Sequence, residues 1–263
     1  MQVKNKRILV TGAAGGIGRE LAKLLAAKGA FVALLGRHIG QLDQLVDEIK
    51  AAGGKACSIA CDLSHQHEVE GVMAEVFRQL GGLDVLINNA GVLDFTEFEQ
   101  QSAEKIEMPL QVNTIAPMQL VNQALPIFKG QGYGVIVNIG SVFGAIGFPH
   151  YVTYSASKFA LRGFSESLRR ELEGTGLQVI YVAPRATSTS LNSADSVDLM
   201  NSQGTKIDAP TYVAERIVSA IESGQLEVTI GQPEGFFSKL NAILPRLVDK
   251  ALARQTKQAK QYL

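Results

Sequence analysis

The chain has no excess of charge of either sign. Its 263 residues include 25 basic and 25 acidic side chains, so the formal net charge is zero. Proteins that bind duplex nucleic acid usually present a basic face, and we therefore expect no nucleic-acid partner. The sequence also lacks an apolar run of about 18 residues, the length that a transmembrane helix requires. We also expect no signal peptide, because residues 1–7 run directly into a candidate strand. These absences predict a cytoplasmic protein.

Cysteine is nearly absent as well. Cys57 and Cys61 lie close to His65 and His67, and all four are zinc-ligand types. On a strand the two cysteines would be about 13 Å apart at roughly 3.3 Å per residue, so one zinc ion could not bind both. We predict buried, reduced thiols and no metal site.

No linker rich in proline, glycine or serine divides the chain, and 46% of its residues are hydrophobic. Apolar β-branched runs alternate with helical patterns, which is typical of one parallel α/β sheet. The expected strands lie near 7–11, 31–36, 55–61, 83–88, 133–139, 177–183 and 226–231. We predict one unit over residues 1–234, with residues 235–263 as an amphipathic helical extension of the same domain.

A glycine-rich turn follows the first expected strand. The segment Thr11-Gly12-Ala13-Ala14-Gly15-Gly16-Ile17-Gly18 stands between that strand and a helical pattern that ends at Gly29. Glycines allow the backbone to approach a pyrophosphate, which binds at the positive end of the helix. A glycine-rich turn can also simply close a loop, but its place between strand and helix favours a dinucleotide site.

The second expected strand ends at Gly36-Arg37-His38, without the acidic residue that binds the ribose of NAD. Arg37 is suited to pair with the 2′-phosphate of NADP. The alternative is a solvated surface arginine. The sequence therefore favours NADP(H), with NAD(H) less favoured.

Tyr154 and Lys158 are four residues apart, and Ser141 precedes them. On a helix the phenol and the ammonium share one face. A free tyrosine has a pKa of about 10, and we expect the lysine cation to lower the pKa of Tyr154. Such a tyrosine could pass a proton to a substrate oxygen that Ser141 also holds. Taken alone, this spacing also occurs on many solvated helices.

Three further segments complete a pattern: Asn88-Asn89-Ala90-Gly91, then Asn113, then Pro184 to Thr189. With the glycine turn, Ser141 and Tyr154-x-x-x-Lys158, their order and spacing resemble the short-chain dehydrogenase/reductase family. The resemblance implies a single-domain Rossmann fold, in which a doubly wound, seven-stranded parallel sheet carries helices on both faces. It also implies a homodimer or homotetramer built through long helices. One such helix is expected from Glu104 to about Lys129, with Pro109 marking a start or kink and Pro117 a second kink.

The resemblance also assigns roles. Asn113, Ser141, Tyr154 and Lys158 become catalytic. Asn113 is expected to kink the long helix and, with a water, to pass protons to Lys158. The residues expected to bind the cofactor are Thr11, Gly12, Gly16, Ile17, Gly18, Arg37, Asp62, Leu63, Asn89, Ala90, Gly91, Tyr154, Lys158, Pro184 and Thr189. The implied activity is NADP(H)-dependent reduction of a carbonyl, or oxidation of a secondary alcohol, on a small-molecule substrate. The alternative is an NADP(H)-binding sensor or scaffold that performs no reaction.

Two features depart from the family. Arg185 replaces a glycine, and it could anchor a substrate anion or turn outward to solvent or a neighbouring loop. Because arginine tolerates a positive φ poorly, φ should be negative here. The polar segment 188–208 resembles the family's mobile substrate-covering loop.

The second departure is the tail after Gly235. An apolar stripe from Phe236 to Leu252 is interrupted by Pro245, and cations accompany it at Lys239, Arg246, Lys250, Arg254, Lys257 and Lys260. This tail could contact a membrane surface, or it could pack on its own site or on a partner subunit. An apolar wall near the substrate would suit an acyl or lipid-like substrate.

Overall fold

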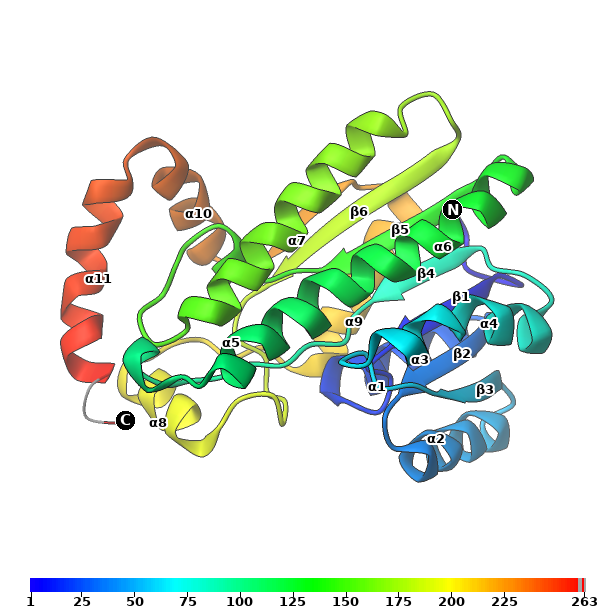
Figure 1. The fold of residues 1–263 in the computed structure, drawn as a ribbon, viewed down its shortest axis with the longest axis horizontal. Coiled ribbons are helices and arrows are strands. Elements are labelled where there is room, and N and C mark those ends of the chain that lie inside the picture. The colour runs from blue at the N-terminus through cyan, green and yellow to red at the C-terminus, as the bar shows by residue number, and fades with distance from the viewer. Residues whose placement is uncertain (260–261, 263) are drawn as a thin grey trace.

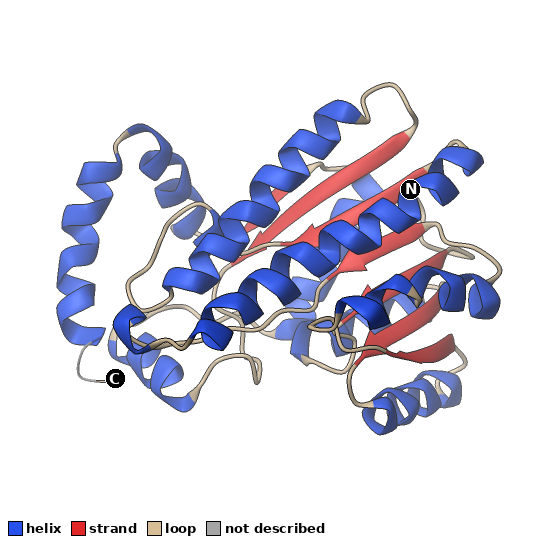
Figure 2. Ribbon diagram, in the orientation of Figure 1, coloured by secondary structure: helices blue, strands red, loops and turns tan. Residues whose placement is uncertain are grey.

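The computed structural model describes residues 1–259 and 262. Its centre is a parallel sheet with the strand order β3-β2-β1-β4-β5-β6-β7. The strands are β1 (Arg7–Thr11), β2 (Phe31–Gly36), β3 (Lys55–Ala60), β4 (Val85–Asn88), β5 (Gly134–Ile139), β6 (Leu177–Pro184) and β7 (Glu227–Ile230). All seven expected strands are confirmed, and so is the doubly wound Rossmann architecture (Figures 1 and 2).

Helices cover both faces because successive strand residues point to opposite sides. Ile8 and Val10 pack with α1 and α9, whereas Leu9 between them belongs to a second core with α4 and α6. The longer helices are α1 (Gly16–Ala27), α2 (Ile39–Ala51), α4 (Val72–Leu80), α5 (Ala103–Leu110), α6 (Ala116–Gln131), α7 (Val152–Glu171), α8 (Ala194–Ser202), α9 (Pro210–Ser223), α10 (Glu234–Ile243) and α11 (Pro245–Ala259). The short ones are α3 (Gln66–Glu70), η1 (Phe98–Gln100), η2 (Gln111–Ile115) and η3 (Val142–Gly144).

The strand order reverses between β1 and β4. The chain leaves β1 toward β2 and later returns to place β4 on the other side of β1. The connections after these two strands therefore diverge at their carboxyl ends, which is where ligands bind in open α/β sheets. The glycine turn and the segment 88–91 both lie at this position.

The helix expected from Glu104 to Lys129 is interrupted. It begins at Ala103, capped by the Ser102 side chain, and α5 passes through a π-helical turn, η2, into α6. Pro109 therefore does not start the helix but lies inside α5, and Pro117 lies in the first turn of α6, where it has no N–H to donate to the preceding turn. The interruption lies between the two prolines and contains Asn113.

The tail forms two helices, and the break at Pro245 is confirmed. Figure 1 shows α10 and α11 as a hairpin at the left, beyond the carboxyl ends of the strands and on the same side as α8. Lys260 lies outside the described residues, as do the side chains of Arg254 and Lys257.

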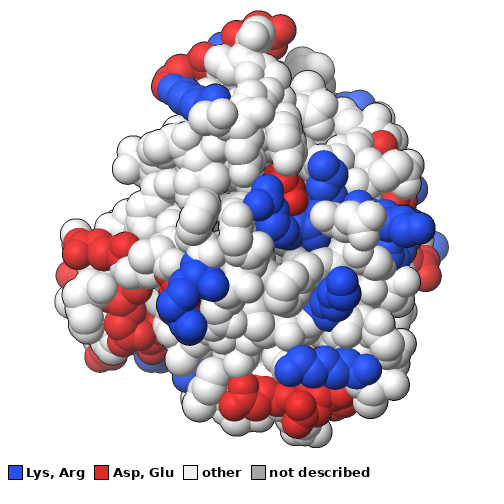
Figure 3. Space-filling view, turned by 90° about the vertical axis from the view of Figure 1, so that its right-hand side faces the viewer, with Lys and Arg blue, Asp and Glu red and all other residues white. Residues whose placement is uncertain are grey.

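The face at the amino ends of the strands lies opposite this hairpin (Figure 3). It carries basic side chains near its centre and acidic ones toward its edges, so neither sign covers it. Among the described residues, no helix is long and apolar enough to cross a membrane.

A buried chain of polar side chains connects the sheet to α7. Asn88 donates from Nδ2 to Oδ1 of Asn138 at 2.9 Å, and Asn138 donates from Nδ2 to Oγ of Ser165 at 2.8 Å. Ser165 in turn donates to the carbonyl of Leu161 at 2.7 Å. Asn138 and Ser165 are both fully buried. This chain fixes the position of α7 relative to the ends of β4 and β5.

Replacing Asn138 with alanine should remove the middle of this chain. The variant leaves the amide of Asn88 and the hydroxyl of Ser165 without their partner in the core. We expect the free energy of unfolding to fall by about 2–4 kcal/mol, because unsatisfied buried groups cost about 1–3 kcal/mol each. Urea denaturation would measure the loss, with Asn122→Ala on the exposed side of α6 as the control. Equal stability of the two variants would contradict this interpretation.

Candidate active site

The glycine turn is built for close backbone approach. Gly12 has φ +63°, and a Cβ there would lie 2.7 Å from the Cα of Ala90. A Cβ at Gly18 would collide with the carbonyl oxygen of Gly12. These positions therefore admit only glycine, and the space above the turn stays open toward the amino end of α1, where a phosphate would bind.

Thr11 and Asn89 hold the two loops together from behind. The hydroxyl of Thr11 accepts hydrogen bonds from the backbone N–H groups of Asn89 and Ala90, both at 3.0 Å. Asn89 donates from Nδ2 to the carbonyl of Thr11 at 2.9 Å. Thr11 is buried and does not line the cavity described below. Thr11, which was expected to bind the cofactor, thus lies behind the cavity wall. It positions Asn89 and Ala90, which form part of that wall.

Arg37 and Asp62 lie at the far end of the site, after β2 and β3. Arg37 is exposed and lines the cavity. Asp62 accepts hydrogen bonds at Oδ1 from the backbone and hydroxyl of Ser64, at 2.9 and 2.8 Å. Burial alone would raise the pKa of Asp62, but the bonds from Ser64 and the charge of Arg37 lower it below its usual value. The pair presents an anion held by Ser64 and an exposed cation at this end of the site.

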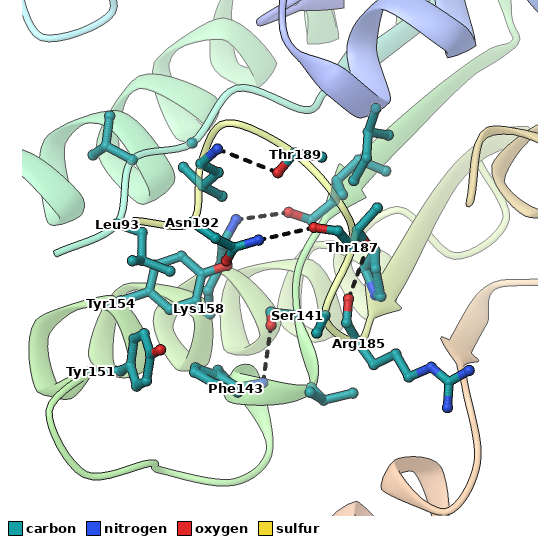
Figure 4. A pocket seen from close by; sticks show the side chains of 18 of the residues that line it. Leu93, Ser141, Phe143, Tyr151, Tyr154, Lys158, Arg185, Thr187, Thr189 and Asn192 are labelled. Carbon is teal, nitrogen blue, oxygen red and sulfur yellow. Dashed lines mark hydrogen bonds between the residues drawn. The ribbon is translucent and has the colours of Figure 1, made fainter. Parts of the chain in front are cut away.

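Tyr154, Ser141 and Lys158 come together at the other end. Figure 4 shows the three side chains gathered beside the loop that follows β5. Tyr154 and Lys158 project from the first turns of α7, and their side chains are 6% and 3% exposed. Lys158 donates from Nζ to the carbonyl of Ile139 at 3.0 Å and lies 5.7 Å from the centre of the Tyr154 ring. Ser141 accepts at Oγ from the N–H of Phe143 at 3.1 Å.

The expectation that Lys158 lowers the pKa of Tyr154 is wrong. Burial raises the pKa of Tyr154 to about 12, opposed by a hydrogen bond with the Ser141 side chain. Burial also lowers the pKa of Lys158 to about 8. The same desolvation acts against both charged forms, so the tyrosine stays protonated and the lysine loses part of its charge.

Asn113 braces the site with every polar atom of its side chain. Its Oδ1 accepts from the N–H of Val92 at 2.8 Å, while Nδ2 donates to the carbonyl of Val92 and to Oγ of Ser157, both at 2.9 Å. It lies in η2 and is fully buried. Because Ser157 lies between Tyr154 and Lys158, the brace sets the position of that turn of α7. Because the polar atoms of its side chain are all engaged, a proton relay at Asn113 would have to use its backbone carbonyl. Pro117 leaves this carbonyl available, since proline has no N–H to donate to it.

One cavity of about 1010 Å³ joins these parts. Every residue expected to bind the cofactor lines it except Thr11, and of the expected catalytic residues only Asn113 lies behind its wall. The rest of the wall is largely apolar, and it is contributed by Leu93, Val142, Phe143, Ile146, Phe148, Tyr151, Leu191, Leu199, Met200, Phe237, Val248 and Leu252. The site therefore has a polar end suited to a nucleotide and an apolar end beyond Tyr154.

An aromatic cluster beside Tyr154 was not anticipated from the sequence. The ring of Phe143 stacks on Phe148 at 4.3 Å and meets Tyr151 and Tyr154 edge-on at 5.0 and 5.8 Å. The hydroxyl of Tyr151 lies 2.6 Å from that of Ser196 in α8. The signal in the sequence that could have indicated this cluster is the run of aromatic residues Phe143, Phe148 and Tyr151 shortly before Tyr154. They hold the segment 188–208, which contains α8 and is not only a loop, against the turn of α7 that carries Tyr154.

Arg185 does not present a free cation to a substrate anion. Its Nε and Nη2 bind both carboxylate oxygens of Asp208 at 3.0 and 2.7 Å, and Nη1 lies 3.4 Å from Glu234. The side chain is only 12% exposed and extends away from Ser141 and Tyr154 (Figure 4). The interpretation as a contact to neighbouring segments is the correct one, and φ is not positive at Arg185. This arginine connects the segment 188–208 to the start of α10.

The cysteines are half-buried and buried thiols. Burial raises the pKa of Cys57 to about 11 and that of Cys61 to about 12. Within residues 1–259 and 262, no group of His, Cys, Asp and Glu side chains could hold a metal ion.

Comparison with known proteins agrees with this geometry. The sequence profile of the family described as "short chain dehydrogenase" matches residues 6–199. The chain is 35% identical over 228 residues to the ketoacyl reductase HetN of a Nostoc strain, covering 86% of this chain and 79% of that protein. It is 30% identical to the uncharacterized oxidoreductase YxnA of Bacillus subtilis, over 96% of this chain and 73% of that one. The chain belongs to the short-chain dehydrogenase/reductase family.

Solved structures show the same fold with a nucleotide. A short-chain dehydrogenase from Burkholderia cenocepacia in complex with NADP superimposes with a TM-score of 0.81 at 29% identity, covering 89% of this chain and all of that one. A metagenomic short-chain oxidoreductase in complex with NADP gives 0.73 at 30% identity, over 88% and 97% of the two chains. The glycine cradle, the open space above it and Arg37 fit a nicotinamide dinucleotide.

The lowered pKa of Lys158 gives a test of the site that needs no turnover. Between about pH 8 and its unfolded value near 10.4, the lysine is neutral when folded and charged when unfolded. The unfolded state then binds more protons, so stability should rise with pH. Relative to Lys158→Met, the cofactor-free protein should gain about 1–2 kcal/mol from pH 8 to about pH 9.5. Urea denaturation measures this difference.

The comparison of Lys55 with Lys55→Met, at an exposed position, serves as the control and should show no such trend. The window ends below pH 10, because an unfolded tyrosine ionises there while Tyr154 does not. A pH-independent difference for Lys158→Met would show that the folded lysine keeps its charge.

Proposed function

We propose that the chain is an NADP(H)-dependent oxidoreductase that reduces a carbonyl, or oxidises a secondary alcohol, by hydride transfer. One observation carries the proposal: a single cavity connects the glycine turn and Arg37 to Ser141, Tyr154 and Lys158. A sensor would need the nucleotide end only. An enzyme would also need a place for the substrate to react. The apolar chamber, with the buried tyrosine and lysine beside it, provides that place.

Each residue has a definite task in this proposal. Bound NADPH would supply the hydride for the carbonyl carbon. Ser141 and Tyr154 hold the carbonyl oxygen, and Tyr154 donates the proton that turns the developing alkoxide into an alcohol. Lys158 binds the nicotinamide ribose and restores the proton to the tyrosine. Asn113 keeps this turn of α7 in place and offers its backbone carbonyl to a water.

We propose that NADP(H) is preferred over NAD(H). Arg37 is exposed at the nucleotide end and forms no ion pair within the described part of the chain, and Asp62 is held by Ser64. A charged bidentate contact from a guanidinium to a 2′-phosphate is among the stronger polar contacts in proteins. The two NADP-bound relatives support the same choice.

The substrate is proposed to be an acyl or lipid-like carbonyl compound. The chamber beside Tyr154 is lined by aliphatic and aromatic side chains, with Val248 and Leu252 of α11 at its outer side. Such a wall binds an aliphatic chain by removing apolar surface from water. A relative named as a ketoacyl reductase supports this class.

We also propose a homodimer or homotetramer built through the helices that contain Asn113 and Tyr154. The cytoplasmic location stays a prediction. Neither affects the assignment of the site within one chain.

Replacing Tyr154 with phenylalanine should remove the proton donor and keep the ring in its aromatic surroundings. We expect kcat for ketone reduction to fall by about 10²–10⁴-fold, the usual contribution of general acid catalysis. Binding of NADPH, followed by its fluorescence, should stay near that of the unaltered protein. Tyr212→Phe on the exposed side of α9 is the control. Undiminished turnover in Tyr154→Phe would rule out this role.

Arg37→Gln tests the choice of cofactor. We expect KM for NADPH to rise by about 10- to 100-fold, the loss of one charge-assisted contact of about 1.5–3 kcal/mol. KM for NADH should change little, because NADH has no 2′-phosphate. Arg170→Gln, at an arginine that is 76% exposed on α7, is the matched control. A parallel rise for both cofactors would show that Arg37 supports the loop rather than the phosphate.

A further inference from the structure

The α10–α11 hairpin exposes large apolar side chains in one short stretch. Phe236, Ile243, Leu244 and Leu247 are 61%, 76%, 51% and 54% exposed. Ile243 is the most exposed of the large apolar side chains in the part of the chain that the structure describes. Ile243, Leu244 and Leu247 surround the turn at Pro245, where α10 ends and α11 begins, whereas Phe236 lies in the first turn of α10. A cluster of this kind usually marks an interaction surface.

Cations flank this apolar apex. Lys239, Arg246 and Lys250 are all exposed, and none takes part in an ion pair among the described residues. The hairpin has two acidic residues, Glu234 and Asp249. Glu234 pairs inward with Arg185, which leaves Asp249 as the acidic residue on the exposed side. Its exposed side therefore combines apolar surface with an excess of positive charge.

The opposite side of the hairpin is already in use. Val248 is 4% exposed and lines the cavity with Leu252, and Asn241 donates from Nδ2 to the carbonyl of Ala145 at 2.9 Å. Arg185 holds the beginning of α10 through Gln232 and Glu234. The hairpin is thus attached on its inner side, and Figure 1 shows it at the outer edge of the molecule, where α11 has no helix beyond it.

We propose that the exposed side of this hairpin docks on an anionic lipid bilayer. Amphipathic helices with apolar residues on one side and flanking Lys and Arg bind such surfaces by burying the apolar groups near the headgroups. A second copy of the chain fits less well. A symmetric contact between two hairpins would bring together two patches with the same excess of positive charge, which costs free energy.

Docking would bring the cavity to the membrane. The helix that contacts the bilayer is the helix whose inner side lines the apolar chamber. A carbonyl compound dissolved in the bilayer would then enter without crossing water. This consequence depends on the proposed oxidoreductase activity, whereas the docking itself does not.

Co-sedimentation of the full chain with vesicles tests the proposal. At low salt we expect binding to phosphatidylcholine vesicles that contain phosphatidylserine, weak binding to phosphatidylcholine alone, and release at high salt. Combining Lys239→Gln, Arg246→Gln and Lys250→Gln should weaken binding to the anionic vesicles by about a hundredfold. Combining Ile243→Ser, Leu244→Ser and Leu247→Ser should weaken it to both kinds of vesicle.

Matched controls separate these effects from general changes of charge or hydrophobicity. Lys50→Gln, Lys55→Gln and Lys129→Gln remove the same charge from exposed positions elsewhere. Phe77→Ser, Tyr212→Ser and Leu226→Ser remove exposed apolar groups from other elements. Both control triples should bind like the unaltered protein, and thermal melting and NADPH binding confirm that each variant is folded whether or not it catalyses a reaction.

Three results would overturn the proposal. The first is no sedimentation at low salt. The second is undiminished binding by both hairpin triples. The third combines two observations: the unaltered protein does not bind vesicles, and light scattering shows a smaller assembly for the hairpin triples than for the unaltered protein. That result would mean that a second copy of the chain covers the hairpin.

Discussion

The close approach of two loops at the carboxyl ends of β1 and β4 is the constraint on which the site depends. Gly12 lies so near Ala90 that no side chain fits between them, and Thr11 and Asn89 bind the loops with hydrogen bonds from behind. This contact places the amino end of α1 and the segment 88–91 on one cavity. Because Gly91 lies next to Asn113 and Lys158, the nucleotide end is held in register with the catalytic end.

Burial has an electrostatic cost at the end of the cavity where we propose that catalysis occurs. Burial removes water from Tyr154 and Lys158. It raises the pKa of Tyr154, which keeps the phenol protonated, and it lowers the pKa of Lys158, which favours the neutral amine. A protonated phenol suits the reduction direction, in which the tyrosine gives up a proton. Asn113 and the chain of Asn88, Asn138 and Ser165 keep α7 in place while these groups stay desolvated.

Much of this could be predicted from the sequence, because local patterns carry it. The seven strands follow from short apolar runs, and the order of the glycine turn, Ser141, Tyr154 and Lys158 gives the site. The features that could not be predicted depend on contacts between residues that are far apart in the sequence. Asp208 and Glu234, the partners of Arg185, are 23 and 49 residues away, so no local pattern reveals them. The pKa of Tyr154 depends on burial by the whole fold, which overrides the expected effect of its lysine neighbour. The kink at Asn113 was implied by the family resemblance, whereas its π-helical form and the bonds of Asn113 to Val92 and Ser157 were not.

The most direct test of hydride transfer in this cavity is isotopic. The protein would be incubated with NADPH carrying deuterium at the transferable position of the nicotinamide and with a panel of 3-oxoacyl thioesters and long-chain ketones. Mass spectrometry of the products then locates the label. The account predicts deuterium on the carbinol carbon of an alcohol product. NADPH that binds tightly and keeps its label with every compound of the panel would contradict it.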